Sequence, residues 1–161
     1  MEKNEKYYWD LLEEVKDPEI PVLSIVDLGI VRDVKMHQEE VEVIITPTYS
    51  GCPAMDFIEV NIKSLLQQAG EDVKVTTVLH PAWTTDWISK NGREKLREYG
   101  IAPPAENSPD KSVLFGEEVT VPCPRCNSED TSMVSQFGST ACKSLYKCNS
   151  CKEPFDYFKC H

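Results

Sequence analysis

Two Cys-x-x-C pairs near the C-terminus are the feature that most limits how this chain can fold. They are Cys123-Pro-Arg-Cys126 and Cys148-Asn-Ser-Cys151, with residues 127–147 between them. Four thiolates in two such pairs complete a tetrahedral zinc site, and this spacing is close to that of a zinc ribbon. A closed shell of four cysteines leaves no position for water or substrate, so the sequence predicts one structural Zn²⁺ per chain. Redox use of the pairs is the alternative.

The segment around these pairs, residues 113–161, is predicted to be a separate β zinc-ribbon module. It is too short to fold on core burial alone, so the metal is expected to supply much of its folding free energy. Side chains alternate along Phe155–Lys159, which predicts a ribbon strand. The aromatic residues of this run exceed what so small a core needs, which indicates a docking surface.

Three of the seven cysteines, Cys52, Cys142 and Cys160, lie outside the two pairs. The chain has seven cysteines and no signal-peptide or membrane-spanning apolar run, so we expect a cytoplasmic protein that uses cysteines for metal or thiol chemistry rather than for disulfides. Cys142 and Cys160 are spare thiols. Cys160 and His161 are alternative metal ligands, although a fraying terminus argues against them.

Residues 1–101 are predicted to form an α+β domain in the order α-β-β-α-β-α. A strand, a helix and a further strand imply a crossover that pairs the third strand parallel to a strand of the hairpin, which makes a small mixed three-stranded sheet. A proline-rich linker, 102–112, would separate this domain from the ribbon. The predicted elements are helix 8–16, strands 30–36 and 41–46, helix 53–69, strand 73–79, a short helix from Thr84 or Thr85, a turn at Asn91-Gly92 and helix 93–99.

The stretch Thr46–Met55 joins the second strand to the second predicted helix and contains one cysteine, Cys52. Pro53 suits a first helical position, so Cys52 is predicted as the N-cap, with its sulfur among free backbone N–H groups. That setting favours a thiolate, which could bind a metal or a cluster or attack an electrophile. The alternative is a small buried hydrophobic side chain. Thr48 and Ser50 flank Cys52 and are candidate site residues.

Charge and composition exclude several functions. The net charge is −10, and neither half of the chain has the Lys and Arg surplus that nucleic-acid binding needs. The sequence lacks the Glu-x-x-His motifs of a di-iron oxygenase and the G-x-G-x-x-G of a dinucleotide site. Asp27 stands among apolar residues and either caps a turn or acts as a ligand or acid–base group.

Residues 5–101 resemble the MIP18-like (DUF59) family, which is tied to iron–sulfur cluster assembly. The resemblance rests on Asp17–Pro21, Ile25–Gly29 and Thr46–Pro53. It implies that Cys52 is the reactive cysteine, acting as a transient ligand of iron or of an iron–sulfur cluster. It also implies that acidic residues lie near that site, at Asp17, Glu19 and Asp27.

Four further stretches in both halves are distinctive, namely Trp83–Ser89, Gly100–Pro104, Phe137–Cys142 and Phe155–His161. Together they resemble the family of D subunits (PaaD) of bacterial phenylacetyl-CoA 1,2-epoxidases. The resemblance implies a non-catalytic accessory role in assembling or maintaining metal centres. Its expected partners are a di-iron oxygenase subunit, an iron–sulfur flavin reductase subunit, or a second copy of the chain. A docking subunit that holds the other components together is the alternative.

Overall fold

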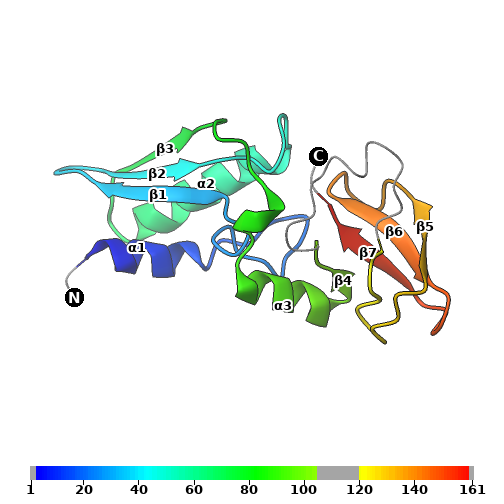
Figure 1. Cartoon of the computed structure of the whole chain (residues 1–161). Coiled ribbons are helices and arrows are strands. Elements are labelled where there is room, and N and C mark those ends of the chain that lie inside the picture. The colour runs from blue at the N-terminus through cyan, green and yellow to red at the C-terminus, as the bar shows by residue number, and fades with distance from the viewer. Residues whose placement is uncertain (1–2, 105–119, 160–161) are drawn as a thin grey trace. The chain divides into compact units, whose positions relative to one another are not determined.

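The computed structural model describes residues 3–104 and 120–159 (Figure 1). By its contacts the chain divides into a first unit, Met1–Gly92, and a second unit, Arg93–His161, and each is described by itself. The division lies within helix α3 (Lys90–Tyr99), ahead of the boundary predicted at residue 101. None of the helices in the described ranges is long and apolar enough to cross a membrane.

The first unit is built on a mixed three-stranded sheet, as the sequence predicts. Strand β1 (Val31–Met36) pairs antiparallel with β2 (Val41–Ile45), and β2 pairs parallel with β3 (Val73–Thr77). Helices α1 (Glu5–Leu12) and α2 (Ala54–Gln68) lie on one side of this sheet (Figure 1). The α+β fold class is therefore confirmed, with β2 as the central strand and α2 as the crossover between the parallel pair.

The core of the first unit follows from two periodicities. Along β2 every second side chain is buried, and along α2 the buried side chains recur about once per turn. Each fully buried aliphatic side chain contributes about 1.5–3 kcal/mol. The buried residues of these two elements are Val41, Val43, Ile45, Ala54, Ile58, Ile62 and Leu66.

Two helix boundaries differ from the prediction. Helix α1 ends at Leu12 rather than near Lys16, because the chain after it turns to form a bridge between Lys16 and Ser24. Helix α3 begins at Lys90, so the turn predicted at Asn91-Gly92 is wrong. The Ser89 hydroxyl oxygen accepts the backbone N–H of Gly92 at 2.9 Å and caps the helix one turn earlier than the glycine suggests.

Gly29 and the short helix η1 (Thr85–Trp87) explain how the chain after β3 is held. Gly29 has φ +71°, and a Cβ there would lie 2.5 Å from the carbonyl oxygen of Trp87. Only glycine permits this approach. The Trp83 indole N–H also donates to the Leu28 carbonyl at 2.7 Å, so both contacts hold the 83–87 segment against the start of β1.

The second unit carries a four-stranded sheet in the order β4-β7-β6-β5. Strand β5 (Thr131–Ser135) pairs antiparallel with β6 (Lys143–Cys148), and β6 pairs antiparallel with β7 (Pro154–Phe158). The fourth strand, β4 (Ile101–Ala102), pairs parallel with β7. Ala102, predicted as the first linker residue, is therefore part of a strand, and residues 105–112 of the predicted linker lie outside the described residues.

The aromatic residues of β7 are buried, which contradicts the docking surface predicted for them. Phe155, Tyr157 and Phe158 are 4%, 9% and 2% exposed. Tyr146 of β6 stacks on Phe155 with ring centroids 5.9 Å apart and meets Tyr157 edge-on at 5.6 Å. Because a unit this small has few apolar residues, its aromatic side chains are needed in the core.

Candidate functional site

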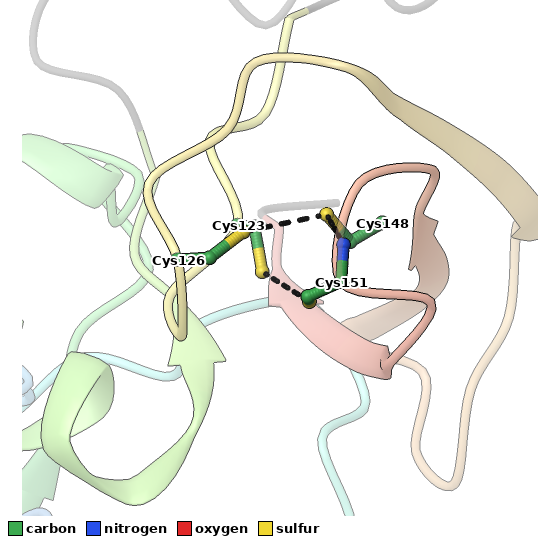
Figure 2. A group of neighbouring side chains, drawn as sticks. All are labelled: Cys123, Cys126, Cys148 and Cys151. Atoms are coloured by element: carbon green, nitrogen blue, oxygen red, sulfur yellow. Dashed lines mark hydrogen bonds between the residues drawn. The ribbon is translucent and has the colours of Figure 1, made fainter.

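The four cysteines of the two Cys-x-x-C pairs converge from two loops of the second unit (Figure 2). Their sulfur atoms all lie within 4.8 Å of one another. The Cys123–Cys151 sulfur pair is 3.8 Å apart, and the Cys126–Cys148 pair is 3.6 Å apart. Zn–S bonds of about 2.3 Å in a tetrahedron require sulfur atoms about 3.8 Å apart, so these four thiols fit a zinc ion.

The two loops share one backbone conformation. The N–H of Cys123 donates to the Ser128 carbonyl at 2.9 Å, and the N–H of Cys148 donates to the Glu153 carbonyl at 3.0 Å. The residue after the second cysteine of each pair has positive φ, 60° at Asn127 and 67° at Lys152. The sequence does not signal these two positions, because neither is glycine, the residue that most often adopts such a conformation.

The electrostatics of the cluster favour a bound cation. A hydrogen bond from the Cys151 backbone lowers the pKa of the Cys148 thiol to about 6. The Glu153 backbone lowers the pKa of Cys151, but burial and the three neighbouring thiols outweigh it and raise that pKa to about 11. One thiol of the cluster therefore deprotonates readily, and the negative charge that results opposes deprotonation of the others. A dication removes that conflict, because all four thiolates can then form together.

Cys52 lies in the loop between β2 and α2 and is half-buried. Its backbone N–H donates to the Tyr49 carbonyl at 3.2 Å, and its carbonyl accepts the N–H of Met55 at 3.3 Å. Burial raises the pKa of its thiol, and the charge of Glu19 adds to that rise, whereas hydrogen bonds from the Ala54 backbone and the Thr48 and Tyr49 side chains lower it. The net shift is upward.

Two predictions about Cys52 are therefore corrected. The N-cap of α2 is Pro53, one residue later than predicted. The thiolate expected at a helix N-terminus is not favoured either, because desolvation outweighs the backbone donor and raises the pKa of the Cys52 thiol. A group that is neutral when free and deprotonates on metal binding is suited to reversible ligation rather than to a standing nucleophile.

The structure brings some of the predicted site residues together. Thr48 and Glu19 act on the Cys52 thiol, and Tyr49, which sequence analysis did not select, joins them. Asp17 positions Glu19, because its Oδ1 accepts the N–H of Glu19 at 2.8 Å and that of Ile20 at 2.9 Å. Ser50 is exposed at the tip of the loop.

Removing the charge of Glu19 should make Cys52 more reactive. In Glu19→Gln the nearby negative charge is lost, so the pKa of the Cys52 thiol should fall and its thiolate fraction at pH 7.5 should rise. We expect alkylation by iodoacetamide to be about two- to fivefold faster, which corresponds to about 0.4–1 kcal/mol. Thr48→Val removes a donor to the sulfur and should slow alkylation instead. Equal rates in both variants would separate these side chains from Cys52.

Asp27 is the centre of a buried hydrogen-bond network within the first unit. It is 2% exposed, and its Oδ1 accepts from the Ser89 hydroxyl at 2.9 Å and from the Asn91 amide at 3.2 Å. Its Oδ2 accepts the N–H of Ser24 at 3.3 Å, and its own N–H donates to the Ser24 hydroxyl at 2.9 Å. Both carboxylate oxygens are in use, which favours the turn-capping interpretation of Asp27 over that of a metal ligand.

Asp27→Ala should therefore act on stability. It leaves the buried N–H of Ser24 and the partly exposed donors of Ser89 and Asn91 without their acceptor, so we expect urea unfolding to show a loss of about 2–4 kcal/mol. Asp10→Ala, at an exposed position of α1, should change stability by less than about 0.5 kcal/mol. A stable Asp27→Ala variant that loses metal handling would instead support the ligand role.

Known proteins resemble both units. Residues 107–159 match the family described as PaaD zinc beta ribbon domain, and residues 9–79 match the family described as iron-sulfur cluster assembly protein. An Escherichia coli (strain K12) protein described as the D subunit of a 1,2-phenylacetyl-CoA epoxidase is 52% identical over 94% of this chain and 90% of its own length. An Fe-S protein maturation auxiliary factor of Porphyromonas gingivalis (strain ATCC BAA-308 / W83) is 35% identical over 53% of this chain and 84% of its own.

Solved structures match the first unit and its sheet. The DUF59 domain of Bacillus anthracis has a TM-score of 0.54 and 29% identity, over 57% of this chain and 90% of that one. A conserved hypothetical protein of Thermotoga maritima has a TM-score of 0.50 and 26% identity, over 59% of this chain and 95% of that one. These likenesses agree with the α+β fold predicted for residues 1–101.

Proposed function

We propose that this chain, which belongs to the family of phenylacetyl-CoA epoxidase D subunits, is a non-catalytic accessory component that assembles or maintains an iron–sulfur or iron centre of such an epoxidase. The observation that carries the proposal is the half-buried thiol of Cys52. It lies in the segment of the first unit, residues 9–79, that matches the iron–sulfur cluster assembly family. The metal is the cargo of Cys52 and not a resident cofactor.

The setting of Cys52 suits the transient binding of a cluster or of iron. The raised pKa of the thiol means that a proton must leave when the metal binds and returns when it is released. One cysteine cannot fill the coordination of a cluster, so a second copy of the chain, the client protein or a small thiol must supply the remaining ligands. The proposed clients are the iron–sulfur reductase and the di-iron oxygenase subunits.

In this proposal the zinc ribbon is structural. Within the described ranges, the four cysteines of the ribbon form the one group of His, Cys, Asp and Glu side chains arranged to hold an ion. Their shell is complete without water or substrate, so chemistry on a bound ligand has no open position there. The ion would link the two knuckles and stabilise the ribbon fold.

A docking role for the ribbon is the second candidate, and one observation favours it. Met133 and Val134 of β5 and Phe137 after it are 50%, 59% and 57% exposed. Such an apolar edge strand is a suitable surface for another subunit. In this alternative Cys52→Ser would leave epoxidase activity unchanged.

The metal content of the client subunits tests the proposal. We expect the reductase and oxygenase subunits produced without this chain to hold less iron, and less reductase cluster absorbance, than subunits produced with it. Equal iron and equal absorbance in both preparations would contradict an assembly role.

A further inference from the structure

We propose that the outward face of α2 is the docking surface for the iron–sulfur client, and that it binds an amphipathic helix of the client that carries Lys or Arg beside an apolar anchor. This inference rests on the proposed function, because it gives the client a place to bind beside Cys52. Helix α2 begins at Ala54, directly after Cys52 and Pro53. A client helix along α2 would therefore lie next to the thiol that must share a cluster with it.

One exposed stripe of α2 is uncharged, although Asp56, Glu59 and Lys63 of the same helix lie beside it. Phe57 and Val60 are 54% and 64% exposed, and Phe57 lies in the first turn of the helix. Asn61, Ser64 and Gln68 continue the same face at helical spacing, and none of them is charged. Apolar anchors without charge are typical of the centre of a protein interface.

A groove runs beside this face. It has a volume of about 380 Å³ and lies between α2 and the turn that follows α1. Its apolar lining comes from Phe57, Leu65 and Val15, and Asn61 and Ser64 add uncharged polar groups. A groove alongside an exposed helix accepts one large apolar side chain of a second helix packed against it.

The charges at the rim select the kind of partner. Glu14 lines the groove and is exposed, and Asp56 is exposed in the first turn of α2. Lys16 is also at the groove and keeps its positive charge while its ammonium group donates to the Glu13 carbonyl at 2.8 Å, so the two carboxylates outnumber one cation there. A basic flank on the client helix would complement Glu14 and Asp56. Positions 1–92 hold 17 acidic and 8 basic residues, and their net negative charge would attract such a helix over a longer range.

The same charges disfavour a second copy of this chain as the occupant. A parallel pair of α2 helices would bring Asp56 near its own equivalent, and like charges at an interface cost affinity. An antiparallel pair of α2 helices would also separate the two Cys52 residues by roughly the length of the helix, since each residue adds about 1.5 Å. Such a dimer could not share one cluster between its thiols.

The test measures binding of purified reductase and oxygenase subunits to the full chain by sedimentation or calorimetry. Phe57→Asp should weaken the association with one of them at least tenfold, because it places a charge at the apolar anchor. Glu14→Lys should weaken the association and reduce its dependence on salt concentration. The matched control is Met36→Asp at the far end of β1, 49% exposed, which should bind as the wild type does.

Three outcomes would overturn this inference: unchanged binding in Phe57→Asp, equal loss in Met36→Asp, or a wild-type dimer that Phe57→Asp dissociates while subunit binding persists. Circular dichroism and the midpoint of urea unfolding should match wild type in Phe57→Asp, which shows that the variant folds. Failure of the proposed function gives a different result, namely Cys52→Ser binding the client and maturing it normally.

Discussion

Cys52→Ser is expected to fold normally and to leave the client subunits without their metal centre. Serine keeps the shape of the side chain but is a poor ligand for iron or for a cluster. Cys52 is half-buried, so we expect a change in stability of less than about 1 kcal/mol. Co-expressed with the epoxidase subunits, this variant should lower the iron and cluster content of the client at least tenfold, measured by elemental analysis and visible absorbance.

Ser50→Ala is the matched control for this experiment. Ser50 lies in the same loop and is exposed, and it contributes no hydrogen bond to the Cys52 sulfur. We expect it to support wild-type maturation, so a defect confined to Cys52→Ser would belong to the thiol and not to the loop. Anaerobic cluster reconstitution on the purified chain gives a second readout, with absorbance lost only in Cys52→Ser. Equal absorbance and equal client iron in the two variants would contradict the role of Cys52.

Removal of the ribbon metal is expected to have the largest effect on the fold. Cys148→Ser deletes a ligand that is fully buried and leaves three thiols that cannot close a tetrahedral shell. Structural zinc binding contributes about 10–16 kcal/mol in small zinc modules, which exceeds what a core of this size supplies. We expect the second unit to unfold, with loss of the near-ultraviolet signal of Tyr146 and Tyr157, while the first unit keeps its helical signal.

Metal analysis and a chelator complete this second experiment. The wild type should contain about one zinc per chain, and EDTA should reproduce the effect of Cys148→Ser until zinc is restored. Cys142→Ser is the control, because Cys142 is a buried cysteine of the same unit outside the four-sulfur cluster, and it should keep its zinc. Iron in place of zinc, or a folded second unit after Cys148→Ser, would contradict the structural role.

The acidic residues of the first unit show which contacts local sequence spacing cannot predict. The resemblance implied that Asp17, Glu19 and Asp27 lie near Cys52, and the charge of Glu19 acts on the thiol. Asp17 shapes the turn that holds Glu19, and Asp27 binds side chains 62 and 64 residues further along the chain. Such distant partners leave no pattern in local spacing, because they depend on how the segment after β3 returns to the start of β1.

The aromatic residues of β7 give a similar lesson. Their alternation correctly predicted a strand, because the direction of successive side chains is a local property of an extended backbone. It did not predict whether the faces of the strand are covered. Pairing of β7 with both β6 and β4 places Phe155 and Tyr157 in the core, and the exposed apolar side chains of the ribbon are on β5 instead.

By itself the sequence determined the order of the elements, the α+β class and the four cysteines that meet in the ribbon, since these follow from local periodicity and from ligand spacing that a tetrahedral ion requires. The tertiary structure alone decided the direction of the pKa shift of Cys52, the partners of Asp27 and the exposure of Phe57. Burial, nearby charge and solvent access all depend on segments that are distant in the chain. They are therefore set only when the unit packs and excludes water from one side of a residue.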